Sequence, residues 1–143
     1  YFPIGKLYED EYVTYKVFDK VKKVSILNTT RYYYRYNITS ITHAKFSEKE
    51  LDRIYASQEK INFCSMKYPN LEKYARCYLV YDCISVLSKM SKYDSKYDVL
   101  IWNNLKDNIF VYLKGTNSII SKTFALIATV SPTLAISCLK IMK

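Results

Sequence analysis

The sequence is short of the residues that break helices and shape tight turns. It has two glycines and three prolines among 143 residues. Loops that cradle a phosphate are built from glycine-rich turns, so this shortage argues against the common nucleotide-binding loops. Few breaks along the chain favour long helices. The length is typical of one domain, and we expect residues 1–143 to form a single domain.

Histidine and paired cysteines are also scarce. The only histidine is His43, and no two of the four cysteines form a C-x-x-C pair. A closed zinc site needs four such ligands, and nucleophilic catalysis needs a base within reach of the nucleophile. We therefore expect no metal site, no cofactor and no enzymatic activity. Three of the four cysteines lie in helix-like apolar patterns. This favours free thiols in a reducing intracellular compartment over disulfides in a secreted chain.

Acidic residues are outnumbered by basic ones, 13 to 22, which gives a net charge of +9. A field of this size attracts nucleic acids, anionic membranes and acidic proteins without distinguishing them. The lysines are spread along the whole chain, with no nucleic-acid-binding consensus beside them. The net charge therefore predicts that a partner is negatively charged, but it does not predict which class of molecule the partner is. Sixteen tyrosines indicate extensive contact surfaces as well as a core.

Between residues 12 and 42 the apolar side chains alternate with polar ones at a period of two. This period predicts three short strands, at 13–17, 24–26 and 32–38. Turn-like residues separate them, so an antiparallel meander is the simplest arrangement. An apolar sheet face of this kind needs helices to cover it.

The motif RYYYRY at 31–36 overlaps the third predicted strand. A period of two divides it into two faces: Arg31, Tyr33 and Arg35 on one, and Tyr32, Tyr34 and Tyr36 on the other. We expect the all-tyrosine face to pack on helices and the basic face to bind a partner. Arg beside Tyr is typical of protein interfaces and also of sequence-tolerant single-stranded nucleic-acid binders.

From residue 47 onward the apolar period becomes helical. Ser47 and Glu50 predict a capping box that starts a helix over 47–63. A proline at position 69 then begins a second helix, whose wide apolar stripe predicts that it is mostly buried. The polar repeat SKYDSKYD at 91–98 predicts a connecting turn after it.

A third helix is predicted over 99–114, with Trp102 as a core anchor and Gly115 as a left-handed terminator. The fold class predicted for the chain is α+β. A three-stranded antiparallel meander (12–42) packs on a C-terminal bundle of four to five helices (47–142).

The segment 123–139 has 17 residues without a charge, which is the lower limit for crossing a membrane. Ser131 followed by Pro132 resembles the start of a new helix, so two short helices packed in a core or docked on a partner are the favoured alternative. We expect this tail to dock on a protein or a membrane through seven apolar residues: Phe124, Leu126, Ile127, Val130, Leu134, Ile136 and Leu139.

The order of the predicted helices, with YDCIS at 81–85, is similar in outline to the viral Bcl-2-like proteins. The resemblance implies a tail-anchored interaction protein. The signature at the start of that family's central helix is absent, and a meander does not belong to its fold.

Together these patterns predict a non-catalytic structural or accessory subunit that binds other protein subunits through the Tyr/Arg strand and the apolar tail. Membrane contact through 123–139 is part of the same hypothesis. A basic nucleic-acid-binding protein of low specificity is the alternative, and the Bcl-2-like protein is the weaker alternative.

Overall fold

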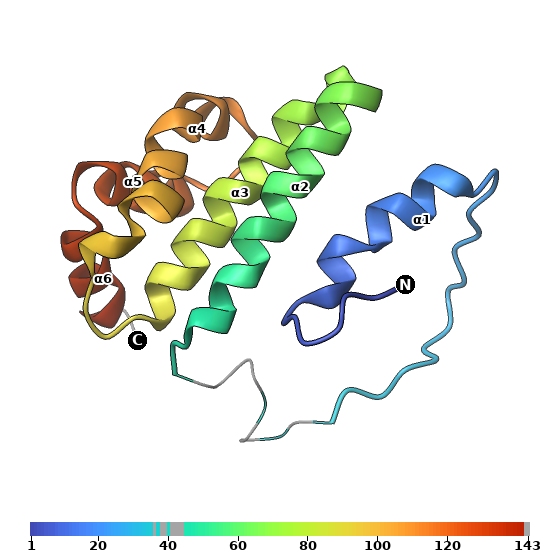
Figure 1. Ribbon diagram of the computed structural model, residues 1–143, viewed down its shortest axis with the longest axis horizontal. Helices are drawn as coiled ribbons and strands as arrows, with labels where there is room; N and C mark the ends of the chain where they lie inside the picture. The colour runs from blue at the N-terminus through green and yellow to red at the C-terminus, as the bar shows by residue number, and fades with distance from the viewer. Residues whose placement is uncertain (36, 38–39, 41–44, 142–143) are drawn as a thin grey trace.

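The computed structural model describes residues 1–35, 37, 40 and 45–141. Every regular element among these residues is helical (Figure 1). In chain order they are η1 (Glu9–Tyr12), α1 (Thr14–Lys20), η2 (Glu48–Leu51), α2 (Asp52–Lys67), α3 (Pro69–Lys89), η3 (Ser95–Tyr97), η4 (Asp98–Trp102), α4 (Asn103–Lys114), α5 (Ile119–Val130) and α6 (Pro132–Ile141).

The predicted α+β fold with a three-stranded meander is therefore wrong for the part of the chain that the structure describes. The first predicted strand falls mainly in α1, and residues 24–26 and 31–35 adopt no regular structure. An alternation of three to five residues is too short to separate a strand from one helical turn. Here Tyr12 is buried and Tyr15 half-buried, three residues apart on the side that meets α2. Tyr36 and Ile38 lie outside the described residues.

Helix α3 is central, as its wide apolar stripe predicts. It packs against α2, α4, α5 and α6. Its buried positions include Leu79, Val80, Cys83 and Leu87, which are at most 1% exposed. Each such side chain contributes about 1.5–3 kcal/mol when removed from water, and this burial holds the bundle together.

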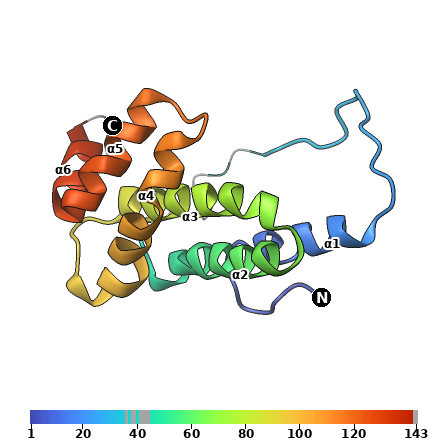
Figure 2. The same ribbon diagram turned by 90° about the horizontal axis from the view of Figure 1, so that it is seen from above.

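Helices α2 and α3 are joined by Tyr68 alone, and they lie side by side along most of their length (Figures 1 and 2). Pro69 occupies the first turn of α3, where its missing N–H costs nothing and its fixed φ suits the helix. The backbone N–H of Tyr68 bonds to the carbonyl of Cys64 at 2.7 Å. A tight link of this kind fixes the pairing of the two helices.

Two predicted helix ends are wrong in detail. The side chain of Ser47 makes no capping hydrogen bond, and a 3₁₀ turn precedes α2. Glu50 does not reach back to the cap because its carboxylate is 1% exposed and paired with Lys89. Gly115 has φ −71° and ψ 173°, an extended conformation that needs no glycine, so its predicted left-handed role is also wrong.

Trp102 is half-buried at the end of η4, directly before α4. Its indole N–H donates to the carbonyl of Thr129 at 2.8 Å, and the Nζ of Lys106 lies 4.0 Å from its ring centroid. The residue thus anchors α4 to the end of α5, although its ring is not enclosed by the core.

The apolar tail forms two short helices, which confirms the alternative drawn from Ser131 and Pro132. Helix α5 ends at Val130, and the Oγ of Ser131 accepts a hydrogen bond from the backbone N–H of Leu134 at 3.3 Å. Among the described residues we find no helix with the length and apolar character that crossing a membrane requires. Helices α5 and α6 lie at the end of the molecule away from α1 (Figures 1 and 2).

Candidate protein-interaction site

One side of α3 remains uncovered although the helix is central. Four large side chains lie along it, with exposed fractions of 49–58%: Leu71, Tyr74, Tyr78 and Tyr81. Their spacing of three, four and three residues places them on one side of the helix, and we call them the tyrosine row. An exposed row of aromatic residues is the composition that protein interfaces favour.

A groove runs between the tyrosine row and the segment formed by η1 and α1. It has a volume of about 550 Å³ and is lined by three parts of the chain: Asp10, Glu11, Thr14, Tyr15 and Phe18; Lys60 and Cys64; and Leu71, Tyr74, Ala75 and Tyr78. We call it the α1–α3 groove. Four of its eleven lining residues are aromatic, two from α1 and two from α3, and its acidic side chains come from η1. It can therefore take an apolar segment and place a cation near the carboxylates.

Lys60 fixes the groove's aromatic walls. Its ammonium group forms an ion pair with Glu11 at 2.6 Å, and its side chain is only 17% exposed. The same Nζ lies 5.3 Å from the ring centroid of Tyr78 and 6.0 Å from that of Tyr15. One cation therefore faces rings on both walls, which holds Tyr15 and Tyr78 at a fixed separation.

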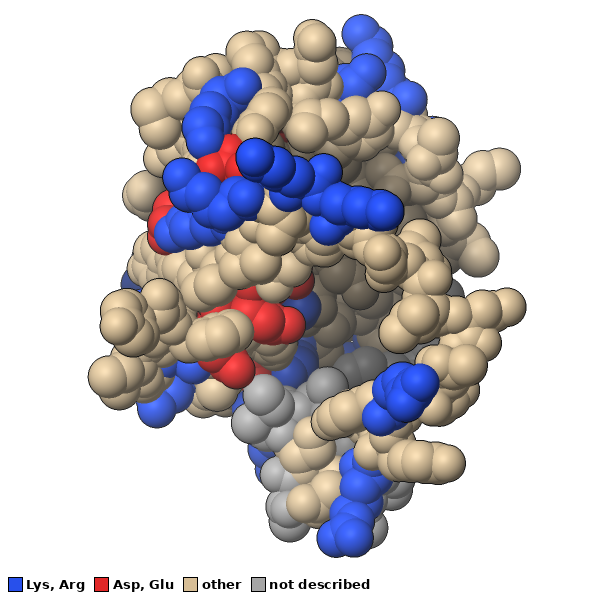
Figure 3. All heavy atoms as spheres, turned by 90° about the vertical axis from the view of Figure 1, so that its right-hand side faces the viewer, with Lys and Arg blue, Asp and Glu red and all other residues tan. Residues whose placement is uncertain are grey.

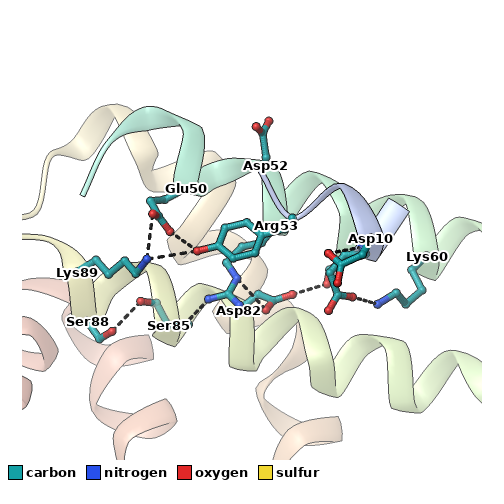
Figure 4. A network of polar contacts seen from close by, with 12 residues as sticks. Asp10, Glu50, Asp52, Arg53, Lys60, Asp82, Ser85, Ser88 and Lys89 are labelled. Carbon is teal, nitrogen blue, oxygen red and sulfur yellow. Dashed lines mark hydrogen bonds and ion pairs between the residues drawn. The ribbon is translucent and has the colours of Figure 1, made fainter. Parts of the chain in front are cut away.

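Behind the groove, a buried polar network joins α2 to α3 (Figure 4). Arg53 forms an ion pair with Asp82 at 3.3 Å and donates to the hydroxyl of Ser85. The hydroxyl of Ser57 donates to the other oxygen of Asp82 at 2.5 Å. Burial raises the pKa of the Asp82 carboxyl, although Ser57 and Arg53 act against that rise. The network gives the buried carboxylate a cation and a hydroxyl donor and so links the two helices, although the Nε of Arg53 is buried without a hydrogen-bond partner.

The same network extends to the N-terminal segment. The hydroxyl of Tyr8 donates to Glu50 at 2.6 Å, and Lys89 donates to the other oxygen of Glu50 at 2.9 Å (Figure 4). The guanidinium of Arg53 lies 4.4 Å from the ring centroid of Tyr8. Burial and the bond to Glu50 raise the pKa of the Tyr8 hydroxyl. Residues just before η1 are thereby fixed to the bundle.

Helix α1, in contrast, has no buried residue. Its C-terminal end is held by Asp19, which accepts hydrogen bonds from Lys67 at 2.5 Å and from Tyr68 at 2.8 Å. Those two bonds lower the pKa of the Asp19 carboxyl. Near its start, the ring of Tyr15 packs edge-on against Phe63 at 5.0 Å. Polar contacts at the helix end, rather than core burial, therefore position this wall of the groove.

The predicted Tyr/Arg contact residues lie in the irregular segment after α1, which runs apart from the helices (Figures 1 and 2). Figure 3 shows the charged side chains on this side of the molecule. Arg31, Tyr33 and Arg35 are exposed. Tyr32 and Tyr34 are also exposed, at 78% and 70%, so the predicted packing of their face on helices is wrong. We call residues 21–35 the arm. Its role in binding remains a prediction.

The seven predicted tail residues have different surroundings. Leu126, Val130 and Leu134 are exposed, at 45%, 76% and 51%, whereas Ile136 is 4% exposed and belongs to the core. Phe124, Ile127 and Leu139 are half-buried.

Within the described residues no group of acidic, histidine or cysteine side chains could hold a metal ion. All four cysteines are free thiols. Cys83 is fully buried, and this burial raises the pKa of its thiol. Cys64 lines the groove and is half-buried, which also raises its pKa.

Sequence reasoning missed the tyrosine row. The signal is present, because residues 71, 74, 78 and 81 follow the helical spacing within 69–89. A second apolar stripe on the same helix hid it, since a helix that is apolar on several sides is normally buried all round. Comparisons of the chain with protein-family models, curated proteins and solved structures return no match.

Proposed function

We propose that the chain is a non-catalytic interaction subunit that binds an amphipathic helix of a protein partner in the α1–α3 groove. The observation that supports this most directly is the exposed tyrosine row beside an aromatic groove of about 550 Å³. Tyrosine offers a large rigid surface with a polar end, and it is enriched at the centres of protein interfaces.

The dimensions of the site favour a helix as the occupant. The tyrosine row extends along α3 from Leu71 to Tyr81, which lies ten positions further along the helix. At 1.5 Å per residue it is about 15 Å long, which is close to three helical turns. Helix-in-groove recognition uses apolar anchors at positions i, i+3 or i+4, and i+7 over such a length.

The charges predict where a basic residue of the partner lies. Glu11 is neutralised by Lys60. The carboxylate of Asp10 accepts a hydrogen bond from the N–H of Glu11 at 3.1 Å and forms no ion pair with another described residue. A lysine or arginine at one end of the partner helix would supply the missing cation.

A displayed library of helical peptides of about three to five turns tests the proposal without a known partner. We expect selected peptides to share an apolar face with a basic residue at one end. Replacing Tyr74 and Tyr78 together by Ala should weaken their binding on the order of 100-fold, because both side chains contribute aromatic surface to the site. Binding is measured by fluorescence anisotropy of a labelled peptide.

The matched control is Tyr32→Ala with Tyr34→Ala, which removes two exposed tyrosines from the arm. We expect peptide affinity to be unchanged in this variant. The proposal is wrong if the library yields no binder, or if the α3 and arm variants lose affinity equally.

A second candidate function is nucleic-acid binding by the arm, and one observation favours it. Residues 21–47 contain five basic residues and no acidic one. In the arm, Arg31 and Arg35 are exposed beside three consecutive exposed tyrosines. Arg charge and aromatic stacking are what sequence-tolerant single-strand binders use.

Anisotropy titrations of a single-stranded oligonucleotide over a range of salt test this candidate. Replacing Arg31 and Arg35 by Gln should reduce the salt slope by about 1.4, at roughly 0.7 for each lost contact. The control is Lys49→Gln with Lys92→Gln, which removes equal charge from exposed positions outside the arm. If both variants lost the same amount of salt slope, the effect would come from net charge alone and not from contacts of the arm.

A further inference from the structure

The net charge of the chain is concentrated in two segments. Residues 1–20 and 48–107 together contain thirteen basic and thirteen acidic residues, and are neutral. Residues 21–47 carry five basic residues and residues 108–143 carry four, with no acidic residue in either segment. The whole charge of +9 therefore belongs to the region around the arm and to the C-terminal region.

The C-terminal region also exposes aliphatic side chains. On α5, Ile119, Leu126 and Val130 are 83%, 45% and 76% exposed, and their spacing aligns them on one side of the helix. On α6, Leu134 and Ile141 are 51% and 85% exposed and lie two turns apart. We call these five residues the α5–α6 face.

Both rows point away from the bundle core. The buried residues of the two helices include Ala125 and Ala128 on α5 and Ala135 on α6, each at most 1% exposed. On α5, buried Ala128 follows Leu126 by two positions, and on α6, buried Ile136 follows Leu134 by two positions. Two positions are slightly more than half a helical turn, so these buried residues lie on the sides opposite the exposed rows.

A cation lies next to the row on α5. Lys122 follows Ile119 by three positions and precedes Leu126 by four, so the three residues are neighbours on the helix surface. Ion pairs within the described residues join positions in 1–20 and 48–107 only, which leaves Lys122 without a carboxylate.

The side-chain types of the α5–α6 face indicate which kind of partner covers it. Protein interfaces are enriched in Tyr, Trp and Arg and depleted in Lys, whereas aliphatic side chains beside lysine are typical of helices that lie on a bilayer. A second copy of the chain would bring a second acid-free basic region against the first. An anionic bilayer surface instead satisfies the lysine and removes the aliphatic side chains from water.

We propose that the α5–α6 face binds the surface of an anionic membrane. The five aliphatic side chains enter the boundary between headgroups and acyl chains, and Lys122 faces the headgroups. Helices of 12 and 10 residues with apolar side chains on one side lie along such a surface. Removing an exposed aliphatic side chain from water gives on the order of a tenfold gain in association.

Flotation of the full chain with lipid vesicles tests the proposal. We expect binding to vesicles of phosphatidylcholine mixed with phosphatidylserine and much weaker binding to phosphatidylcholine alone. Replacing Val130 and Leu134 together by Ser should reduce association with the mixed vesicles about 30-fold or more. Lys122→Gln should reduce it about fivefold, with no change on phosphatidylcholine alone.

The matched control is Val24→Ser with Ile26→Ser. These residues are 58% and 94% exposed on the arm, the other acid-free segment. We expect this variant to float like the unmodified chain. Circular dichroism checks that each variant is folded, and Ile119→Ser with Ile141→Ser is a second pair should the first perturb the helices.

Three results would overturn the proposal. They are absence of binding to the mixed vesicles, equal binding to both kinds of vesicle, and equal losses in the face and arm variants. Sedimentation supplies a further test. If the chain is a dimer and the variant Val130→Ser with Leu134→Ser is a monomer, the α5–α6 face binds a second copy of the chain and the proposal is wrong.

Discussion

The tyrosine row and the α5–α6 face are both exposed and apolar, yet they differ in nearly every other respect. The row consists of three tyrosines and a leucine, carries three hydroxyl groups and borders a groove with acidic side chains. The α5–α6 face is aliphatic, has no hydrogen-bonding group of its own and belongs to a region without acidic residues. Exposure alone therefore does not identify a partner, whereas the side-chain type and the surrounding charge do.

The two surfaces are also supported differently. Beneath the tyrosine row, α2 and α3 are held by a buried network of charges and hydroxyls. Beneath the α5–α6 face, small residues such as Ala125 and Ala128 allow close packing on the core. A substitution can therefore damage one surface and leave the other intact.

The largest effect is expected for Asp82→Ala. Removing the carboxylate leaves Arg53 buried without its counter-charge, and we expect the free energy of unfolding to fall by about 3 kcal/mol. Urea denaturation measures this loss. Flotation of the folded variant with anionic vesicles should be unchanged, because the α5–α6 face does not depend on the network.

Two controls accompany this experiment. Lys16→Ala breaks an exposed ion pair with Glu59 and should cost less than about 1 kcal/mol. Arg53→Met combined with Asp82→Leu replaces the buried pair by apolar groups and should lie within about 1 kcal/mol of the unmodified chain. A full loss in the double variant would show that the ion pair has no apolar equivalent.

The support of the α5–α6 face is tested by Ala128→Leu. Ala128 is 1% exposed, so the larger side chain has no space and should lower the free energy of unfolding by about 2 kcal/mol. Thr123→Leu, at an exposed position on the same helix, should change it by less than about 0.5 kcal/mol. Urea denaturation of both variants checks this, and equal stabilities would mean that α5 is loosely packed.

Salt should separate the two surfaces functionally. Raising the ionic strength from about 0.01 to 0.1 M shortens the Debye length from about 30 to 10 Å. Association with anionic vesicles should fall on the order of tenfold, because it draws on the lysines of the acid-free region. Peptide binding in the groove should fall about twofold, since one exposed carboxylate, Asp10, supplies its charge. Similar losses would contradict the difference drawn between the two surfaces.

The smallest effect is local and depends on pH. The carboxyl of Asp19 has a lowered pKa in the folded chain, so its contribution is present above the unfolded value of about 4 and is lost as pH falls further. The carboxyl of Asp82 has a raised pKa in the folded chain. Between the unfolded pKa of about 4 and this raised pKa, lowering the pH therefore stabilises the folded state, because only the folded state binds the proton. We therefore expect acid to release α1 before it opens the α2–α3 pair.

Hydrogen exchange measured below pH 4, with correction for the intrinsic rate, tests this order of events. Backbone amides of 14–20 should lose protection while those of α3 keep it. Asp19→Asn should produce the same loss at neutral pH, because an amide cannot form the ion pair with Lys67. Simultaneous loss of protection in α1 and α3 would show that α1 is part of the cooperative core.

The sequence predicts the helical half of the molecule well and the first third badly. The proline at position 69, the break at Ser131 and Pro132, and the long apolar periods are local signals, and each marks a helix boundary that the structure contains. The helix of 14–20 has only two turns, so its pattern was indistinguishable from a strand. Its position depends on contacts with residues more than forty positions away, such as those between Asp19 and Lys67.

The candidate sites were predictable only in part. The seven predicted tail residues include the exposed positions 126, 130 and 134, but the burial of Ile136 and the exposure of Ile119 and Ile141 depend on how α5 and α6 pack. For the arm, a period of two predicts a strand with two faces, but residues 31–35 adopt no regular structure and both sets of side chains are exposed. The tyrosine row could be predicted only if it were known which side of α3 the neighbouring helices leave exposed.

The single-residue link at Tyr68 has a consequence for the order of folding. Closing so short a connection costs little chain entropy, so we expect α2 and α3 to pair early. The N-terminal segment must find that pair across the long connection from 21 to 47, which is slower. The wall formed by α3 is thus complete before α1 arrives, and a partner helix present during synthesis would meet the tyrosine row while its other wall is still absent.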